Sequence, residues 1–300
     1  MLIMITGATG QIGSALIKSL GAGSSIMAAG RNELDLAQPG QIASTLDRIG
    51  PDLIVNAAAY TAVDRAEDDR EMAFRINAEA PGAMASWAAR RGVPVIHFST
   101  DYVFDGTGTR PWREDDPANP LSVYGASKLA GDDAIRSARG SHLIVRTSWV
   151  YATQGTNFLR TIARLAMQGR ELRIVSDQVG APTSARLIAD ALAGMIGMDS
   201  TLLANRFAAS KGMVNIAASG ATSWYGFAVA IVDGLKARGV ALAAERVVPI
   251  ATKDYPTKAK RPANSRLDLT RLRHLFGVQP PQWNQALDAE LDQLAATLVR

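Results

Sequence analysis

The sequence predicts an α/β fold in which a doubly wound parallel sheet is followed by a smaller C-terminal lobe. Continuous apolar runs alternate with stretches of helical spacing through the first half of the chain. This rhythm is typical of βαβ units whose sheet is covered by helices on both faces. A glycine-rich loop follows the first apolar run, and the rhythm breaks after Tyr151. Together these observations indicate a Rossmann-type sheet with a second lobe folded onto it.

The elements of the first half follow from their apolar patterns. Short continuous runs such as MLIMIT and VPVIHFST predict buried strands. Apolar residues three and four positions apart, as at Ile12, Ala15 and Leu16, predict helices. The predicted strands span residues 1–6, 24–30, 52–59, 93–100 and 142–151, and the predicted helices span residues 11–20, 40–50, about 66–91 and about 122–138.

The second half predicts a mixed lobe. Helices are expected near residues 156–168, 184–196 and 222–238, short strands near 172–175, 213–217 and 246–251, and an amphipathic helix over the last 20 or so residues. We therefore expect residues 1–150 to form a dinucleotide-binding domain. Residues 151–300 are expected to form mainly a substrate-binding lobe, with some segments returning to the first domain.

The composition narrows the class of protein. The chain is 47% hydrophobic and 20% charged, as globular proteins are. It contains no cysteine, which excludes disulfides and thiolate ligands and fits a reducing compartment. No basic leader and no apolar stretch of about 18 residues is present, so neither a signal peptide nor a membrane span is expected. The net charge of +4 is too small to predict nucleic-acid binding. We expect a cytoplasmic protein.

The glycine loop predicts a dinucleotide site. In MITGATGQIG, the glycines Gly7, Gly10 and Gly13 follow the first strand and open the first helix. The first allows a tight turn, the second lets the backbone approach a pyrophosphate, and the third lets helix and strand pack closely. The start of the helix offers free amides to the phosphates. A purely structural glycine turn is the alternative.

The second strand predicts which cofactor is used. Arg31 follows its last residues and could pair with a 2′-phosphate, which favours NADPH. A surface arginine is the alternative, and Asp35 with Leu36 could still accept NADH.

At the end of the third strand, Asn56 is expected at the carboxyl edge of the sheet, where ligands bind. The small Ala57 beside it would let a cofactor lie against the backbone.

The catalytic candidates lie further along the chain. Thr100 ends the fourth predicted strand, and Tyr124 and Lys128 share one face of the next helix. A hydroxyl, a phenol and an ammonium group suit carbonyl reduction. Tyr124 would protonate the carbonyl oxygen, Lys128 would lower the pKa of the phenol and hold the cofactor ribose, and Thr100 would bind the substrate oxygen. A Tyr–Lys pair at this spacing is weak evidence when taken alone.

Motifs along the whole chain make a more specific case. TGATGQIG, NAAAYTAVD, STDYVFDG, YGASKLAG, RTSWVY, DQVGAPTSA and RPANSRLD occur in this order. Together they resemble the dTDP-4-dehydrorhamnose reductase family of extended short-chain dehydrogenase/reductases. The resemblance implies NADPH-dependent reduction of the 4-keto group of dTDP-4-dehydro-6-deoxy-L-mannose to dTDP-L-rhamnose. It also implies the catalytic roles given above for Thr100, Tyr124 and Lys128.

The resemblance also implies binding residues. Cofactor contacts are implied at Gly10, Gln11, Ile12, Asp35, Leu36, Ala59, Tyr60 and Thr61. Asp101 and Trp149 would join Thr100 at the substrate. Some members of the family hold Mg²⁺ between subunits through carboxylates, but the matching positions here are Ala15 and Arg186. Neither can hold Mg²⁺, which needs oxygen ligands, so we expect no metal and a monomer or weak homodimer.

Three further residues are candidate substrate contacts. Arg261, in the basic stretch KDYPTKAKRPANSRLD, could bind the substrate pyrophosphate. A nucleic-acid patch or a solvated loop are the alternatives. Asn157 and Gln178 could line the cleft, although core packing would explain the aromatic segment around Asn157 equally well. His97 lies within a predicted buried strand, where we expect it to satisfy a local hydrogen bond.

Other functions remain open at this stage. A reductase or an epimerase acting on another 4-keto-6-deoxy sugar nucleotide is one alternative. An epimerase would retain its cofactor through a full cycle, whereas a reductase would consume NADPH stoichiometrically. A non-catalytic regulatory subunit of the same fold is the other, although such a subunit would tolerate loss of Tyr124 or Lys128.

Overall fold

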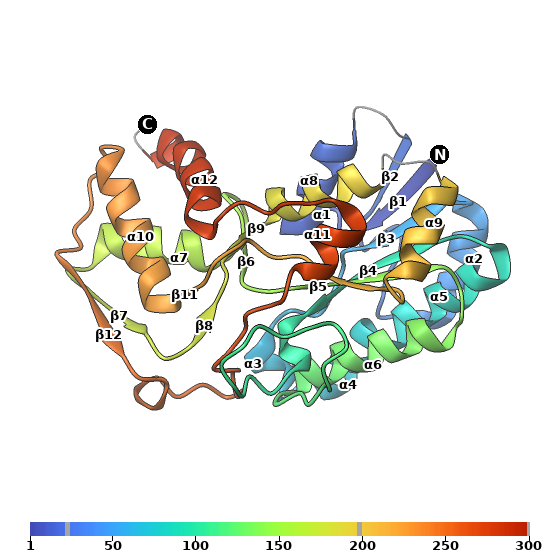
Figure 1. Cartoon of the computed structure of the whole chain (residues 1–300), viewed down its shortest axis with the longest axis horizontal. Coiled ribbons are helices and arrows are strands. Elements are labelled where there is room, and N and C mark those ends of the chain that lie inside the picture. Colours follow the sequence, from blue (N-terminus) through green and yellow to red (C-terminus); the bar gives the residue numbers. More distant parts are fainter. Residues whose placement is uncertain (22–24, 197–199, 299–300) are drawn as a thin grey trace.

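The core of the molecule is one parallel sheet. The computed structural model describes residues 1–21, 25–196 and 200–298 (Figure 1). Six strands lie in the order β10-β5-β4-β3-β1-β2, and every pairing is parallel. They are β1 (Leu2–Thr6), β2 (Ser25–Ala29), β3 (Leu53–Asn56), β4 (Val95–Thr100), β5 (His142–Thr147) and β10 (Met213–Asn215). The chain leaves β1 for β2 and returns on the other side of β1 as β3, which creates the switch point at which ligands bind.

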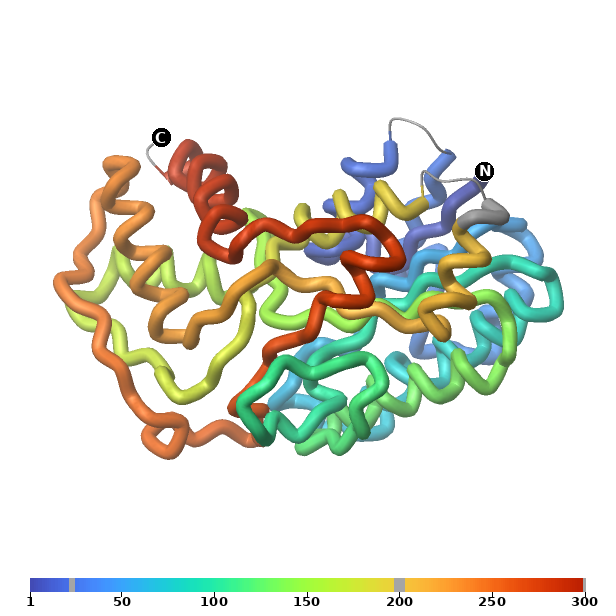
Figure 2. Tube along the Cα trace, viewed as in Figure 1, coloured from blue at the N-terminus to red at the C-terminus, as the bar shows by residue number. Residues whose placement is uncertain are grey.

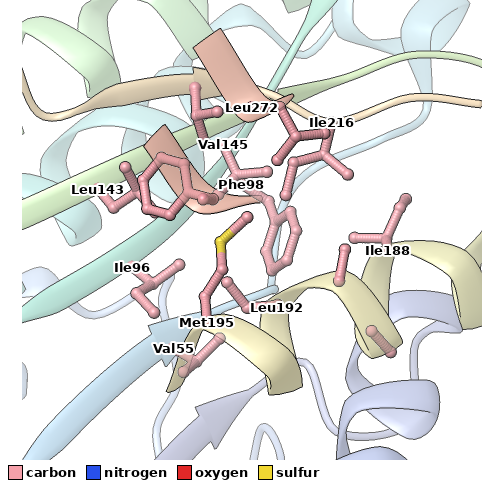
Figure 3. Close-up of a cluster of buried hydrophobic side chains, with 14 of the residues drawn as sticks. Val55, Ile96, Phe98, Leu143, Val145, Ile188, Leu192, Met195, Ile216 and Leu272 are labelled. Carbon is pink, nitrogen blue, oxygen red and sulfur yellow. The ribbon is translucent and has the colours of Figure 1, made fainter. Parts of the chain in front are cut away.

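Helices cover both faces of this sheet, as the apolar strands predict. One face is covered by α1 (Gln11–Leu20), α8 (Ala185–Ile196), α9 (Ser200–Ala209) and α11 (Thr270–Phe276). The other face is covered by α2 (Pro39–Ile49), α5 (Ala80–Arg91) and α6 (Val123–Ser137). Successive side chains of a strand point to opposite faces. Val55 and Phe98 therefore pack with Leu192 and Met195 of α8 (Figure 3), while Ile54 packs towards α2 and α5.

The second lobe has a separate apolar core. Its helices are α7 (Phe158–Gln168), α10 (Trp224–Ala237) and α12 (Trp283–Leu298). Its short strand pairs are β7 (Glu171–Val175) with β12 (Arg246–Ile250), β8 (Val179–Gly180) with β11 (Thr222–Ser223), and β6 (Val150–Tyr151) with β9 (Thr183–Ser184). Tyr151 is fully buried in this core against Phe227, with ring centroids 5.2 Å apart. Core packing therefore accounts for this aromatic residue.

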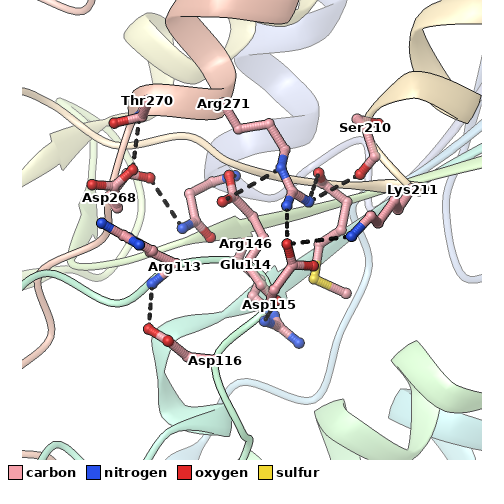
Figure 4. Close-up of polar contacts among 12 residues, drawn as sticks. Arg113, Glu114, Asp115, Asp116, Arg146, Ser210, Lys211, Asp268, Thr270 and Arg271 are labelled. Atoms are coloured by element: carbon pink, nitrogen blue, oxygen red, sulfur yellow. Dashed lines mark hydrogen bonds and ion pairs between the residues drawn. The ribbon is translucent and has the colours of Figure 1, made fainter.

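The chain crosses between the lobes more than once. Figure 2 shows the segment before α11 running back from the second lobe to the first, and α12 returning to the second. Arg271 of α11 attaches this returning segment to the first lobe, because its guanidinium pairs with Asp115 at 2.5 Å and with Glu114 at 3.7 Å (Figure 4). Glu114 also accepts a hydrogen bond from the amide of Asn215 at the end of β10. Residues 213–215 thus belong to the central sheet although they come late in the chain.

The predicted helical stretch over residues 66–91 is confirmed from Arg70 onwards, but it contains a π-helical turn, and a separate short helix precedes it. The structure has α3 (Val63–Ala66), α4 (Arg70–Phe74), a π-helix (Arg75–Glu79) and then α5. A π-helix accommodates an extra residue in the helical turn, and here it directs Asn77 towards Tyr60 and Ser127, to which Asn77 is hydrogen-bonded. Local apolar spacing does not encode such a turn.

The predicted strand over 142–151 is also interrupted. β5 ends at Thr147, and Trp149 has φ of 50°, in the left-handed region that few non-glycine residues adopt. α9 and α11 have no counterpart in the prediction. Predicted residues 24, 299 and 300 lie outside the described residues. In the described ranges, no helix is both long enough and apolar enough to cross a bilayer.

Candidate active site

The predicted catalytic residues meet at the carboxyl edge of the sheet. Thr100 ends β4, and Tyr124 and Lys128 lie in the first two turns of α6, which packs against β4. The helix begins here because Ser122 caps it, accepting a hydrogen bond from the amide of Gly125 at 3.1 Å. Gly125 is required, because a Cβ on it would lie 2.2 Å from the carbonyl oxygen of Tyr102. Close packing thus brings the phenol to the strand end.

The glycine loop has the shape that a dinucleotide pyrophosphate needs. Gly7 has φ of 64°, and a Cβ on it would lie 2.8 Å from the Cα of Ala58. A Cβ on Gly13 would lie 2.1 Å from the carbonyl oxygen of Gly7. Gly10 is the N-cap of α1, and no side chain caps this helix. A glycine turn before an uncapped helix start fits a pyrophosphate. Gln11 and Ile12 open the same helix.

The predicted adenosine contacts lie beyond β2. Arg31 is exposed in the turn that follows this strand, where a phosphate could reach it. Asp35 accepts a hydrogen bond from the amide of Ala37 at 3.0 Å, so one of its oxygens is held by the backbone. Leu36 is buried in the core beneath α2. A cofactor contact at Leu36 would therefore use its backbone.

The segment after β3 is fixed by a residue that the sequence analysis missed. The side-chain oxygen of Asn77 accepts the amide of Tyr60 at 2.8 Å, and its nitrogen donates to the carbonyl of Tyr60 at 3.1 Å and to the hydroxyl of Ser127 at 2.9 Å. This segment carries the predicted cofactor contacts Ala57, Ala59, Tyr60 and Thr61. Asn77 therefore links residues 57–61 to α6 through Ser127, which directly precedes Lys128.

Asn56 is the last residue of β3, as predicted, but its side chain is buried. Its side chain is 1% exposed, and its oxygen accepts the hydroxyl of Thr6 at 2.6 Å. Its nitrogen faces Nδ1 of His97 at 3.0 Å. The Asn56 amide is thus used inside the protein, and a contact between Asn56 and a cofactor would have to involve its backbone.

The phenol of Tyr124 is in its protonated form. Burial raises the pKa of Tyr124 to about 12, and the hydrogen bond between Tyr124 and Thr100 opposes this rise. The carboxyls of Asp101 and Asp132 raise the pKa further. The predicted lowering by Lys128 is not found in the protein alone, because burial dominates. A phenol that retains its proton at neutral pH can serve as a general acid.

Lys128 is held in a dry pocket. It is 1% exposed, and its Nζ donates to the carbonyl oxygen of Phe98 at 2.6 Å. The same nitrogen lies 3.0 Å from Nε2 of His97. Burial lowers the pKa of Lys128 to about 8, and the carboxyl of Asp132 opposes this shift. The ammonium and amine forms are therefore close in free energy near neutral pH.

Asp101 is a buried carboxyl beside the catalytic threonine. Burial raises the pKa of Asp101 to about 7, and hydrogen bonds from Ser265 and Thr100 oppose the rise. The hydroxyl of Thr100 donates to this carboxyl at 3.2 Å. Asp101 can therefore be either a donor or an acceptor near neutral pH.

Trp149 faces the second lobe. Its ring stacks on Trp224, with centroids 3.6 Å apart and planes 11° apart. Gly180 makes room for it, because a Cβ there would lie 2.6 Å from the indole. The stack holds the indole at the junction of the lobes, next to β5.

Arg261 is held by the first lobe. Its guanidinium forms two hydrogen bonds with the carboxylate of Asp64, at 2.6 and 3.1 Å. Asp64 also accepts the amide of Ala259 at 3.0 Å. Lys258 forms an ion pair with Asp68 nearby. These contacts anchor the basic segment over the first lobe.

Asn157 and Gln178 have protein partners. Asn157 donates to the side-chain oxygen of Gln11 at 2.9 Å, which joins α7 to the start of α1. Gln178 is 5% exposed and donates to the hydroxyl of Thr252 at 3.1 Å. Asn157 therefore lies at a contact between the lobes, whereas Gln178 bonds within the second lobe, and substrate binding by either residue remains a prediction.

The hydrogen bonding expected of the buried His97 is present. Its Nδ1 lies 3.0 Å from the amide nitrogen of Asn56, and its Nε2 lies 3.0 Å from Nζ of Lys128, a residue of the predicted catalytic set. The position of His97 in β4, opposite Asn56 in β3, was the available signal.

The positions at which family members hold Mg²⁺ have other partners here. Arg186 pairs with Glu290 of α12 at 2.9 Å, and Ala15 is an apolar residue of α1. No group of three or more histidine, aspartate or glutamate side chains suited to a metal occurs within the described ranges.

Comparison with known proteins assigns the family. A profile described as the RmlD substrate binding domain matches residues 1–296. A dTDP-4-dehydrorhamnose reductase of Burkholderia thailandensis is 46% identical, covering 96% of this chain and 97% of the relative. A crystal structure of a dTDP-4-dehydrorhamnose reductase from Clostridium acetobutylicum superposes with a TM-score of 0.89 at 34% identity, covering 98% of this chain and 99% of that one. One from Bacillus anthracis in complex with NADP gives 0.86 at 31% identity, covering 97% and 99%. The chain belongs to the RmlD family of dTDP-4-dehydrorhamnose reductases.

Proposed function

We propose that this protein reduces the 4-keto group of dTDP-4-dehydro-6-deoxy-L-mannose to give dTDP-L-rhamnose, with NADPH as the reductant. The observation that carries the proposal is the meeting of Thr100, Tyr124 and Lys128 at the sheet edge, beside the glycine turn. The likeness to dTDP-4-dehydrorhamnose reductases over nearly the whole chain supports this reaction. The relative with bound NADP supports the cofactor.

Tyr124 is the proposed general acid. Reduction of a ketone requires a proton at the oxygen as hydride reaches the carbon, and bound NADPH supplies that hydride. The buried phenol retains its proton well above neutral pH. Thr100, hydrogen-bonded to the phenol, fixes its direction and would donate to the developing oxyanion. The two hydroxyls thus hold and protonate one oxygen atom.

Lys128 is proposed to stabilise the phenolate that remains. Its ammonium is one helical turn from Tyr124 and is kept dry by the sheet. In a dry site a positive charge lowers the cost of the negative phenolate more than it would in water. Lys128 would also donate to the cofactor ribose.

The remaining binding roles divide between the cofactor and the sugar nucleotide. Gly7, Gly10 and Gly13 would hold the cofactor pyrophosphate, and Arg31 would bind the 2′-phosphate. Asp101 and Trp149 would contact the sugar, and Arg261 would contact its pyrophosphate. Asp64 would keep the guanidinium of Arg261 oriented for that contact.

We also propose a division of labour along the chain. Residues 1–150 would bind the cofactor, and most of residues 151–300 would bind the substrate, apart from segments such as β10 that join the first sheet. We propose a cytoplasmic monomer or weak homodimer that needs no metal, nucleic acid or membrane. The pairing of Arg186 with Glu290 supports the absence of a carboxylate metal site there.

The decisive experiment follows NADPH consumption with dTDP-4-dehydro-6-deoxy-L-mannose and identifies the product by NMR. Stoichiometric consumption that yields dTDP-L-rhamnose is expected, with the same rate in EDTA. A talose-type product would overturn the proposed stereochemistry. Retention of cofactor without net consumption would indicate an epimerase, and no turnover of any 4-keto sugar nucleotide would favour a regulatory subunit.

A further inference from the structure

Three polar side chains form a buried row across the sheet. Thr6 of β1 is opposite Asn56 of β3, which is opposite His97 of β4. Each is at most 2% exposed. The hydroxyl of Thr6 donates to Asn56 at 2.6 Å, and the amide nitrogen of Asn56 lies 3.0 Å from Nδ1 of His97. The row ends at Lys128, whose Nζ lies 3.0 Å from Nε2 of His97. A continuous hydrogen-bonded chain thus leads to the catalytic amine.

The donors and acceptors of this row fix which ring nitrogen of His97 carries a proton and whether Lys128 is charged. Burial and the charge of Lys128 lower the pKa of His97 well below its usual value, so the ring is neutral and carries one proton. With the amide nitrogen of Asn56 facing Nδ1, that nitrogen of the ring must accept, and the proton is on Nε2. Nε2–H then points at Lys128. Two donors cannot bond each other, so this arrangement requires Lys128 as a neutral amine.

The opposite arrangement suits the ammonium form. If the amide of Asn56 turns over, its oxygen accepts Nδ1–H of His97, and its nitrogen donates to the hydroxyl of Thr6. Nε2 then has a free lone pair and accepts from the ammonium of Lys128. The carbonyl of Phe98 accepts from Lys128 in both forms. In this arrangement the amide of Ala58 keeps the hydroxyl oxygen of Thr6 as its acceptor, and the hydroxyl hydrogen of Thr6 gives up the acceptor that Asn56 provides in the first arrangement.

We propose that His97 and Asn56 are positioning residues that couple the protonation of Lys128 to the tautomer of His97 and the orientation of the Asn56 amide. The coupling concerns the protein itself, and only its effect on turnover rests on the proposed reductase function. Because Lys128 keeps His97 and the carbonyl of Phe98 as partners in both forms, it can lose and regain a proton without losing a hydrogen-bond partner of its own. The row therefore keeps the lysine fixed while its charge changes.

The charges around Lys128 set where this change occurs. Tyr124 and Asp132 face it along α6, and His97 faces it from β4. Arg146 of β5 pairs with Asp132 at 3.6 Å, which offsets part of the carboxylate charge. The net result is the lysine pKa of about 8. The tautomer of His97 should therefore change near pH 8, although the ring itself gains no charge.

The first test needs no substrate. Long-range ¹H–¹⁵N NMR of histidine-labelled protein distinguishes the two tautomers, and the chain has only 3 histidines to assign. We expect His97 to be protonated at Nδ1 at pH 6.5 and at Nε2 at pH 9.5, with a midpoint within about one unit of pH 8. His142 is the internal control, because its Nδ1 lies 2.8 Å from the carbonyl oxygen of Gly140, which can only accept, so that nitrogen should carry its hydrogen in both samples. One unchanging tautomer at His97 would overturn the proposal.

The second test uses variants. His97→Leu fills the space but removes one of the two acceptors of Lys128, His97 Nε2 and the carbonyl of Phe98. The alkaline limb of the pH profile of kcat/KM should therefore move down by about one unit or more. His97→Gln restores an amide that can turn either way, and the limb should return to within about half a unit of wild type. A uniform loss at all pH values in both variants would show a structural role only. If wild-type protein did not turn over the substrate, the reductase proposal would fail, while the NMR result would still decide the coupling.

Discussion

The two sides of the active site are built in different ways. Thr100, Tyr124 and Lys128 come from one strand and one helix of the first lobe. Thr100 and Lys128 are buried, Tyr124 is partly buried, and all three are hydrogen-bonded. On the substrate side, Arg261 is held by Asp64 through an ion pair between two loop-connected segments, with the Asp64 side chain about half exposed. Regular packing fixes the first set, and contacts between the lobes fix the second.

The difference in how the two sides are held predicts that they affect kcat and KM separately. Moving a group of the first set would require breaking sheet register or helix packing, which costs several kcal/mol. Exposed ion pairs are worth about 0–1 kcal/mol each, and the charge-assisted hydrogen bonds between Arg261 and Asp64 about 1.5–3 kcal/mol, so the contacts between the lobes cost less to rearrange around a substrate. Changes on the catalytic side should therefore alter kcat, whereas changes on the substrate side should alter KM.

The largest expected effect is on the catalytic side. Tyr124→Phe removes the general acid and should lower kcat by about 10²–10⁴-fold. Stability should not fall, because the phenyl ring fills the same buried space. Turnover and thermal unfolding measured on the same preparation check this. Near-normal turnover would exclude Tyr124 as the general acid and would contradict the expectation that changes on this side alter kcat.

A second prediction concerns the stability cost of the catalytic side. A buried acid whose pKa is raised contributes stability at low pH and loses it as pH rises through the folded pKa, here from about 4 to about 7 for Asp101. Asp101→Asn should therefore gain on wild type by about 3 kcal/mol between pH 5 and pH 8. Denaturant unfolding at both pH values measures this gain.

The matched control for this prediction is Asp105→Asn. Hydrogen bonds from Thr107 lower the pKa of Asp105, so its carboxylate favours the fold at neutral pH and loses that contribution in acid. Between pH 5 and pH 8 the stability difference between this variant and wild type should therefore stay constant, whereas that of Asp101→Asn should change. A pH-independent difference for Asp101→Asn would contradict the burial argument.

The third prediction moves to the substrate side. Asp64→Asn releases the guanidinium of Arg261, and the KM for the sugar nucleotide should rise about tenfold, as expected for a charge-assisted pair worth 1.5–3 kcal/mol. kcat should change by less than about threefold. Lys258→Ala, which removes the exposed pair with Asp68, is the control and should leave KM almost unchanged. A fall in kcat alone would show that the two sides are not separate.

The smallest effect is expected at the cofactor end. Arg31 is exposed, so its pairing with a 2′-phosphate is screened by solvent and salt. Arg31→Ala should raise the KM for NADPH about fivefold and leave that for NADH almost unchanged. Arg48→Ala, on the exposed last turn of α2, controls for the loss of surface charge. Equal rises in the KM for NADPH and for NADH would show that Arg31 does not bind the 2′-phosphate.

Local patterns explain how far the sequence predicted the fold. The predicted bounds of α1 match those observed, and most strands agree within a few residues, because apolar spacing and glycines are read directly from neighbouring positions. The π-helix around Asn77 and the break at Trp149 were not predictable in this way. The first depends on hydrogen bonds to Tyr60 and Ser127, and the second on Gly180 and Trp224, all distant in the sequence.

The site shows the same limit. Thr100, Tyr124 and Lys128 could be found from spacing and from their places at a strand end and a helix start. The partner of Lys128 could not, because His97 and Asn56 meet only when β3 and β4 are paired in the observed register. The raised pKa of Tyr124 likewise depends on burial, which spacing does not report.

The left-handed backbone of Trp149 has a consequence for redesign. A side chain larger than glycine in this conformation costs roughly 1–2 kcal/mol, and here the stack on Trp224 offsets that cost. Trp149→Gly would recover this strain but lose the stack and leave a cavity at a buried position, at a cost of about 3–5 kcal/mol. The left-handed turn between β5 and β6 therefore depends on the indole for its stability. Redesign at this position should keep an aromatic side chain.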